Sequence, residues 1–263
     1  MLIAQITDFH INAPGKLVER SVDTAICLER AVAQLLRCEP LPDIVLATGD
    51  LAETGRAGEY AYVRELLAPI TLPLFVIPGN HDERGALRSA FRDHTYLPRA
   101  GEFLQYAIDD FPLRLIALDT VIAGAPGGEL CEERLGWLDA RLREMPDKPT
   151  VVFMHHPPFP TGIRHMDRMS LANPDVFGAI IARHPQIERV LCGHVHRSIQ
   201  VRYKGTIASI CPGTAHQIKL DLRPDGPAAF TLEPPGFQLH FWDEGTGLVT
   251  HTASIGVYPS QVF

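Results

Sequence analysis

Side chains that bind metal ions and move protons gather in five short clusters along this chain. Carboxylates, a carboxamide and imidazoles supply oxygen and nitrogen donors in these clusters, without a thiolate. Such a donor set suits divalent Mn, Fe, Co or Zn better than Ca or Mg. The clusters are Asp8-Phe9-His10, Gly49-Asp50, Gly79-Asn80-His81-Asp82, His155-His156 and Gly193-His194-Val195-His196. They predict a metal site, although turns collect Asp and His for backbone reasons as well.

The spacing within the clusters favours chelation. In an extended segment, residues two apart point to the same side, so Asp8 and His10 can hold one ion or straddle two. His194 and His196 repeat this spacing. A glycine stands directly before Asp50, where it permits a sharp turn and a close approach of the backbone.

The elements that must position these clusters are strands and helices in alternation. Each cluster follows an apolar run that is typical of a buried strand, at residues 2–7, 43–48, 73–78, 150–154 and 189–192. Helical patterns cover residues 19–37, 131–145 and 173–185. This alternation predicts an α/β fold. Because sites form at the carboxyl ends of parallel strands, we expect five strands to deliver their clusters to one rim.

The rest of the chain is richer in strand patterns. Residues 103–108 and 113–118 read as a hairpin, and no helical pattern follows residue 198. The strand patterns beyond it lie at residues 198–203, 206–211, 237–242 and 247–253, with a proline-containing connection at 224–235. We therefore expect a β-rich C-terminal layer.

Bulk properties exclude some functions. The chain has 263 residues and a formal net charge of −7, which argues against a surface that tracks a nucleic acid polymer. No apolar run approaches the ~20 residues of a membrane span, and the N-terminus lacks the basic region of a signal peptide. The five cysteines show no CxxC spacing, which indicates reduced thiols. We expect a cytoplasmic protein that does not bind membranes.

The five clusters, taken in order, resemble the signature of the calcineurin-like metallophosphoesterase superfamily, D-x-H, G-D, G-N-H-D/E, H and G-H-x-H. The resemblance implies a four-layered α/β/β/α sandwich with two divalent metal ions. It implies that one ion is bound by Asp8, His10 and His196, and the other by Asn80, His155 and His194. Asp50 would bridge both ions.

Longer stretches resemble class III cyclic-nucleotide phosphodiesterases and bacterial glycerophosphodiesterases, at residues 49–60, 78–88, 153–169 and 212–218. The similarity weakens toward the C-terminus, the family's variable cap and oligomerisation region. It implies a catalytic core over 1–200 and a β-rich completion with a cap or oligomerisation segment over 201–263. Because the apolar segment 237–242 and the connection at 224–235 look insufficiently covered by one chain, we expect a dimer or higher homo-oligomer.

The expected activity is hydrolysis of small phosphodiesters, either cyclic nucleotides or glycerophosphodiesters, by attack of a metal-bound hydroxide. Asp50 and His81 are the candidate catalytic residues. Asn80, His81 and His216 are the candidate substrate contacts, and His81 either binds a phosphate oxygen or protonates the leaving alkoxide. Asp82 is expected to orient its neighbours or to cap the helix that begins near Glu83.

Three other functions fit the same clusters. The first is a phosphomonoesterase or pyrophosphatase, and the second is a nuclease, which the net charge disfavours. The third is a non-catalytic scaffold, which should have lost ligands, whereas this sequence has lost none.

Overall fold

The five-stranded sheet of the structure is built from the two ends of the chain. The computed structural model describes residues 1–259 and 261–262. The strand order in this sheet is β13-β12-β1-β2-β3, with β1, β2 and β3 parallel and β12 antiparallel to both β1 and β13. The strands are β1 (Leu2–Ile6), β2 (Ile44–Thr48), β3 (Leu74–Ile77), β12 (Gly236–Asp243) and β13 (Gly247–Ser254).

A second, six-stranded sheet has the order β4-β5-β6-β7-β9-β8. Its strands are β4 (Tyr106–Ile108), β5 (Arg114–Ala117), β6 (Thr150–Phe153), β7 (Ile187–Cys192), β8 (Ile199–Tyr203) and β9 (Thr206–Ile210). The five apolar runs before the clusters are therefore strands, and they are divided between the two sheets. β1, β2 and β3 belong to the first sheet, whereas β6 and β7 belong to the second.

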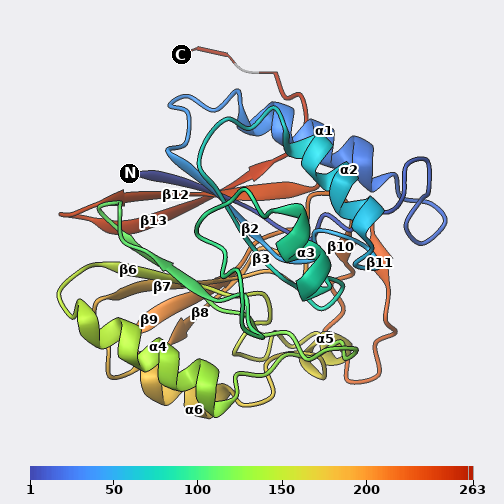
Figure 1. Ribbon diagram of the computed structural model, residues 1–263. Helices are drawn as coiled ribbons and strands as arrows, with labels where there is room; N and C mark the ends of the chain where they lie inside the picture. The colour runs from blue at the N-terminus through green and yellow to red at the C-terminus, as the bar shows by residue number, and fades with distance from the viewer. Residues whose placement is uncertain (260, 263) are drawn as a thin grey trace.

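Helices cover the outer faces of the two sheets, so that four layers follow one another (Figure 1). The helices on the side of the first sheet are α1 (Thr24–Leu35), α2 (Ala57–Leu67) and α3 (Arg84–Ala90). Those on the second sheet are α4 (Glu132–Glu144) and α6 (Pro174–Ile181). The α/β class predicted from the sequence is confirmed, and the two sheets lie between helices in the α/β/β/α order that the resemblance implied.

The alternation of side chains along β6 explains why both faces of the second sheet are apolar. Val151 and Phe153 belong to the core that contains the first sheet, whereas Val152 belongs to the core under α4 and α6. Successive residues of a strand point to opposite faces, so a sheet buried on both faces reads as a continuous apolar run.

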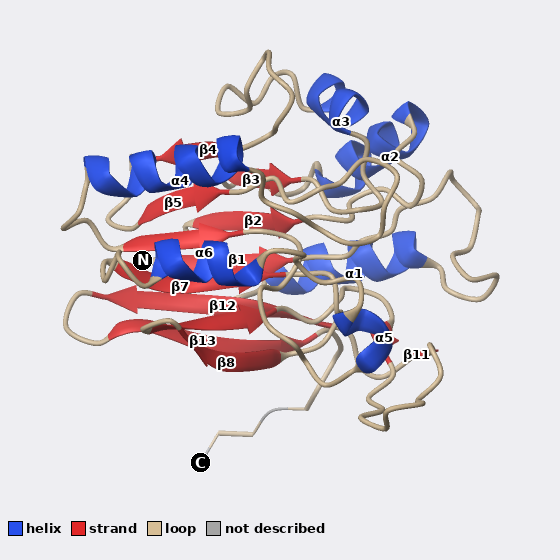
Figure 2. Ribbon diagram, turned by 90° about the horizontal axis from the view of Figure 1, so that it is seen from below, coloured by secondary structure: helices blue, strands red, loops and turns tan. Residues whose placement is uncertain are grey.

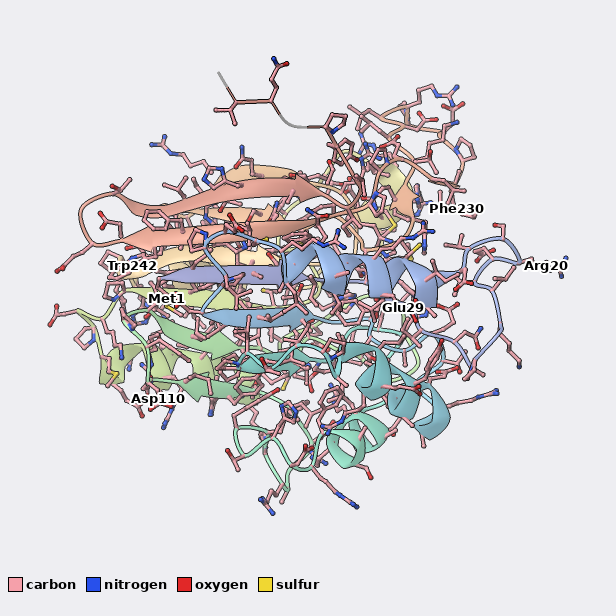
Figure 3. All side chains as sticks on the ribbon, turned by 90° about the horizontal axis from the view of Figure 1, so that it is seen from above. Met1, Arg20, Glu29, Asp110, Phe230 and Trp242 are labelled. Carbon is pink, nitrogen blue, oxygen red and sulfur yellow. The ribbon has the colours of Figure 1, made fainter. Side chains whose placement is uncertain are left out.

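Local signals explain where the elements differ from expectation. The helix predicted over 19–37 begins only at Thr24, because the Asp23 side chain accepts a hydrogen bond from the Ile26 amide and caps it. Val18 and Val22 pair across a tight turn before it (Figure 3 labels Arg20 in this turn). The proline-containing connection includes β11 (Phe230–Thr231), which pairs with β10 (Gln217–Ile218).

The segment over 237–242 is covered better than the sequence suggested. β12 lies between β1 and β13, and Phe237 is fully buried, although Phe241 remains 46% exposed. Within the described residues, every helix is too short or too polar to cross a membrane. The short helix α5 (Arg164–Asp167) lies in the loop that follows β6.

Candidate active site

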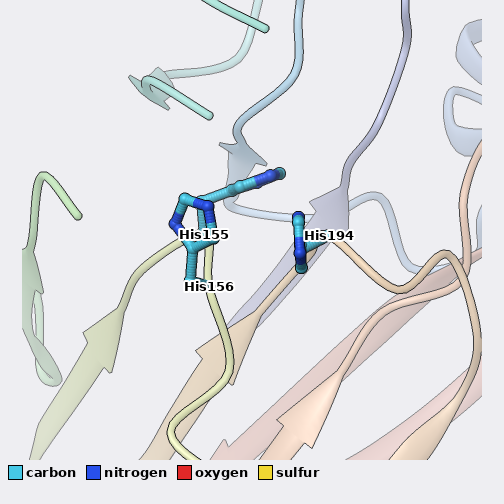
Figure 4. A group of neighbouring side chains, drawn as sticks. All are labelled: His155, His156 and His194. Atoms are coloured by element: carbon cyan, nitrogen blue, oxygen red, sulfur yellow. The ribbon is translucent and has the colours of Figure 1, made fainter. Parts of the chain in front are cut away.

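The loops that follow five strands of both sheets bring the predicted ligands together. Asp8 and Asp50 follow β1 and β2, and Asn80 follows β3 of the first sheet. His155 and His194 follow β6 and β7 of the second sheet (Figure 4). Backbone hydrogen bonds join the loops of each sheet, from the Asp8 amide to the Gly49 carbonyl at 3.1 Å and from the Gly193 amide to the His155 carbonyl at 3.0 Å.

Five of the predicted ligands have a left-handed backbone conformation. The φ angles are 56° at Asp8, 49° at His10, 51° at Asp50, 73° at His194 and 50° at His196. Non-glycine residues seldom adopt this conformation, which costs on the order of 1–3 kcal/mol at each position and collects at functional sites. These five residues therefore adopt an unfavourable backbone conformation, which orients their side chains.

Glycines let the loops approach one another. A Cβ atom on Gly79 would lie far inside van der Waals contact with the Asp50 carboxylate and the Asp50 amide nitrogen. A Cβ atom on Gly193 would meet the Thr7 hydroxyl in the same way. These positions require glycine because the backbones pass too close for any side chain.

The first predicted metal group converges on a small space. His10 Nε2 lies 3.1 Å from His196 Nε2 and 3.6 Å from Asp50 Oδ2. His196 Nε2 lies 3.4 Å from Asp8 Oδ1. The structure thus brings together the residues that the resemblance assigned to one ion, with Asp50 at their side.

The second predicted group converges in the same way. The Asn80 Oδ1 atom lies 3.2 Å from His155 Nε2 and 3.0 Å from His194 Nδ1. His155 Nε2 lies 3.3 Å from Asp50 Oδ2. Asp50 Oδ2 therefore faces nitrogen atoms of both groups, the position that a bridging carboxylate requires.

The outer nitrogens of the ligand imidazoles show that these groups suit cations. His10 Nδ1 donates to the Glu53 carboxylate at 2.9 Å, and His155 Nδ1 donates to the Thr48 carbonyl at 2.9 Å. His196 Nδ1 donates to the His216 carbonyl at 3.1 Å. Because these acceptors favour a proton on Nδ1, each of the three imidazoles in its neutral form directs the Nε2 lone pair inward at other acceptors. A divalent cation satisfies such an arrangement.

The pKa values of the site residues depend on their burial and on the charged groups around them. Burial alone would lower the pKa of His10, but the hydrogen bond to Glu53 and the charges of Asp50 and Asp8 raise it to about 9. Burial raises the pKa of Asp8 to about 6. Burial lowers the pKa of His196 to about 3, which leaves this imidazole neutral and ready to bind a metal.

Glu53 is a site residue that the sequence analysis missed. Its Oε2 atom binds His10 and lies 3.7 Å from His81 Nδ1, while its backbone carbonyl accepts a hydrogen bond from the same His81 nitrogen at 2.8 Å. A carboxylate behind a ligand imidazole fixes the tautomer and the ring orientation. In the sequence, only its position three residues after Asp50 points to it. This signal is weak, because many solvent-exposed glutamates also stand a few residues from a predicted ligand.

Asp82 orients the loops, as expected. Its carboxylate accepts hydrogen bonds from the amides of Leu51, Ala52 and Gly79, and from the Tyr60 hydroxyl at 2.9 Å. It therefore ties the loop after β2 to the loop after β3 and to helix α2. The residue that caps α3 is Glu83, whose side chain accepts from the amides of Gly85 and Ala86.

His156 lies beside the second group, and its ring centroid is 4.6 Å from that of His194 (Figure 4). Both of its nitrogens have other partners. Nε2–H donates to the Pro126 carbonyl at 3.2 Å, and Nδ1 accepts from the Thr120 hydroxyl at 2.8 Å. This leaves no lone pair for a metal ion, so His156 fixes the loop that contains Pro126.

The predicted substrate contacts line a pocket of about 220 Å³ in front of both groups. His81 is at its wall, with Nδ1 bound to Glu53 and Nε2 left for a ligand. His216 is buried, and its Nδ1 atom has no hydrogen-bond partner among the described residues. Beyond the predicted ligands and substrate contacts, the wall consists of two carboxylates, Glu19 and Glu53, and an apolar part formed by Val18, Pro126, Met166, Met169 and Ile218.

Comparisons with known proteins agree with this geometry. The profile of a family described as calcineurin-like phosphoesterase matches residues 1–198. The chain is 38% identical over 259 residues to the probable glycerophosphodiester phosphodiesterase GpdQ of Arcobacter nitrofigilis, which covers 98% of this chain and 94% of that protein. It is 30% identical over 217 residues to the 3′,5′-cyclic adenosine monophosphate phosphodiesterase CpdA of Escherichia coli K12, at coverages of 82% and 77%.

Solved structures share the fold at low sequence identity. A dimetal phosphatase from Danio rerio superposes with a TM-score of 0.63 and 16% identity, over 97% of this chain and 99% of that one. Identity at this level indicates the fold alone.

Proposed function

The chain belongs to the calcineurin-like phosphoesterase family, and from this premise we propose that it is a binuclear metal-dependent phosphodiesterase acting on small phosphodiesters. The observation that carries the proposal is the pair of donor groups that share Asp50 Oδ2. Its relatives' names support two substrate classes, glycerophosphodiesters and cyclic nucleotides.

We propose that Asp8, His10 and His196 hold one divalent ion and that Asn80, His155 and His194 hold the other, with Asp50 between them. Mn, Fe, Zn and Co all suit this donor set. When bound, two such ions supply Lewis acidity toward phosphate oxygens and lower the pKa of a water molecule. The chain's own contribution is to fix the ligand imidazoles through Glu53, Thr48 and the His216 carbonyl.

Around that centre, His81 and His216 would bind the substrate. His81 presents Nε2 to the pocket, where it either holds a phosphate oxygen or protonates the leaving alkoxide. Asn80 uses Oδ1 toward the ligand imidazoles, so its amide hydrogens remain to bind a phosphate oxygen. The apolar wall would face the alcohol part of a small diester.

Removal of the bridging carboxylate tests the proposal. Asp50→Ala should lose bound metal and turnover, because the two donor groups share Asp50 Oδ2. The two sheets should still fold. Elemental analysis after loading with Mn(II), together with circular dichroism, measures both properties. The matched control is Asp93→Ala, which removes an exposed carboxylate that pairs with Arg64 and does not line the pocket. Full occupancy by two metal ions in Asp50→Ala would contradict the bridging role.

A substrate panel separates the remaining functions. We expect metal-loaded enzyme to cleave a glycerophosphodiester or a cyclic nucleotide with a higher kcat/KM than the corresponding monoester. A preference for monoesters or for a DNA strand would indicate one of the rival activities, and no turnover on any of them would indicate a scaffold.

We further propose that the protein is cytoplasmic and forms a homo-oligomer.

A further inference from the structure

One wall of the substrate pocket belongs to a loop that holds none of the predicted ligands. This loop follows β5 of the second sheet, over residues 118–131, and its Pro126 lines the pocket. His81 lines the same pocket from the loop after β3 of the first sheet. The width of the pocket between His81 and Pro126 therefore depends on how these two loops are held against each other.

Arg84 connects the two loops. It is the first residue of α3 and follows closely after His81 in the chain. Its Nε donates to Asp119 Oδ2 at 2.7 Å, and its Nη2 donates to Asp119 Oδ1 at 2.9 Å. The same Nη2 donates to the Val121 carbonyl at 2.7 Å. The Asp119 side chain is fully buried, and a bidentate pair of this kind fixes distance and orientation together.

The base of the loop after β5 is anchored from the other side as well. The Asp119 carboxylate accepts the Val121 amide hydrogen at 3.0 Å, and Arg134 of α4 donates from Nη1 to the Asp119 carbonyl at 2.9 Å. The Phe103 ring stacks with both arginines, and its centroid lies 5.3 Å from Arg84 Cζ and 4.4 Å from Arg134 Cζ. In Figure 2, α3 and α4 lie toward the same margin of the molecule, and the loop after β5 contacts both helices.

Hydrogen bonds extend this anchor to Pro126. Thr120, next to Asp119 in the chain, donates from its hydroxyl to His156 Nδ1 at 2.8 Å. The Nε2–H group of His156 donates to the Pro126 carbonyl at 3.2 Å. The ion pair between Arg84 and Asp119 therefore acts on the position of Pro126 through this loop.

We propose that Arg84 is a positioning residue that sets the width of the pocket between His81 and Pro126, and thereby selects diesters of small alcohols. This proposal deepens the proposed phosphodiesterase function and rests on it. The pocket of about 220 Å³ is smaller than the roughly 300–1,000 Å³ of most ligand pockets, which suits a small alcohol. Without Arg84, the buried Asp119 carboxylate loses its bidentate partner and the two loops move apart. A small diester then loses contact with one wall, whereas a bulky diester still contacts both.

Two substrates with the same leaving group test this selection. Methyl 4-nitrophenyl phosphate has a small second alcohol, and thymidine 5′-(4-nitrophenyl phosphate) has a bulky one. With Mn(II)-loaded enzyme, Arg84→Gln should raise the KM of the methyl ester about tenfold and that of the thymidine ester less than about threefold, with smaller effects on kcat. Arg84→Lys keeps the charge without the bidentate geometry, so its KM values should lie between those of wild type and Arg84→Gln. The control is Arg64→Gln, which removes a bidentate pair with Asp93 outside the pocket and should leave both KM values unchanged.

The double variant Arg84→Gln/Asp119→Asn covers the case in which a lone buried carboxylate prevents the folding of Arg84→Gln. Its KM values should equal those of Arg84→Gln, because both variants remove one and the same pair. Equal increases of the two KM values in either variant, or an increase of the same size in Arg64→Gln, overturn the proposal.

A readout without substrate separates this proposal from the proposed function. The Glu129 amide donates to the Thr120 carbonyl across the loop at 2.9 Å, and its hydrogen exchange should be about tenfold faster in Arg84→Gln than in wild type. An unchanged exchange rate, or loss of bound Mn(II) in Arg84→Gln, overturns the role of Arg84. Wild-type enzyme that hydrolyses neither ester would contradict the proposed function, and with it the selection of substrates, even where the exchange rate changes as expected.

Discussion

At the scale of single residues, the site is held by contacts that lie behind the predicted ligands. The left-handed backbone conformations of Asp8, His10 and Asp50 cost free energy. The hydrogen bonds around these residues prevent the backbone from relaxing to a more favourable conformation. A cation that binds only the folded chain offsets part of this cost by mass action. The residues behind the ligands should therefore affect metal affinity as well as turnover.

Glu53→Gln should weaken metal binding about 10- to 100-fold, since a neutral amide accepts the His10 Nδ1 proton less strongly than a carboxylate does. Titration with Mn(II) or Co(II) measures the affinity directly. The control is Glu19→Gln, which neutralises a second carboxylate of the same pocket that makes no hydrogen bond to a predicted ligand in the described structure. Equal affinities for wild type and Glu53→Gln would remove Glu53 from the site.

His81→Ala should slow alkyl diesters by about 10²–10⁴-fold if His81 is the general acid. A nitrophenyl diester should be slowed less, because that leaving group departs without a proton. Steady-state rates of the two substrates with one metal-saturated preparation give the comparison. Equal losses would mean that His81 only holds a phosphate oxygen.

At the scale of elements, the site depends on how closely the loops after the strands pass one another. Asp82 holds two of these loops and is itself held by Tyr60 from α2, whose hydroxyl also accepts the Glu83 amide hydrogen. A shift of about 1 Å in such a loop can cost 10²-fold in rate. The glycines at which two loops pass close to each other are therefore important for the positions of the site residues.

Gly79→Ala should lower turnover by about 10²-fold and release metal, because the added methyl group displaces the Asp50 carboxylate. The matched control is Gly136→Ala in α4, where the added Cβ meets open space. That substitution should leave activity unchanged and stabilise the helix by up to about 1 kcal/mol. Kinetics, metal analysis and urea unfolding of both variants provide the measurements. Normal metal content in Gly79→Ala would contradict the close-approach argument.

At the scale of the whole molecule, a line of buried polar groups connects the two sheets. The Gln5 side chain in β1 donates to the Thr48 hydroxyl at 2.9 Å and to the Cys192 carbonyl of β7 at 3.0 Å. His240 Nε2 donates to Gln5 Oε1 at 3.1 Å, and its Nδ1 accepts from the Thr250 hydroxyl at 2.8 Å. The line fixes one sheet against the other, and it requires a neutral imidazole at His240.

His240 should therefore make the stability of the fold depend on pH. Burial and then Arg189 lower its pKa to about 3, against about 6.5 in the unfolded chain. Its stabilising effect is complete above pH 6.5 and is lost as the pH falls toward 3, because only the unfolded chain takes up the proton. Between pH 7.5 and 5, wild type should lose about 2 kcal/mol more unfolding free energy than His240→Gln.

Urea unfolding at the two pH values, with EDTA in every sample, isolates this effect because the remaining histidines are common to both proteins. Replacement of exposed His251 on β13 by Gln is the control and should keep the wild-type dependence on pH. If His240→Gln kept it too, the neutral imidazole would have no part in the pH dependence.

The sequence by itself determined the strands that precede the clusters, the α/β class and the family. Those features are encoded locally, since continuous apolar runs and the order of short motifs can be recognised in the sequence whatever the arrangement of the chain. The tertiary structure decided how the pieces meet. It divided the five strands between two sheets, because β12 from the far end of the chain pairs with β1 and makes β1 interior.

The same reason explains the roles of Glu53 and Tyr60. A glutamate in a turn and a tyrosine in a helix have the same local pattern whether or not they reach a ligand loop. Their role depends on hydrogen bonds with residues 20 or more positions away, since Glu53 accepts from His10 and Tyr60 donates to Asp82. Contacts of that range are set by packing of the whole molecule, and no spacing in the sequence records them.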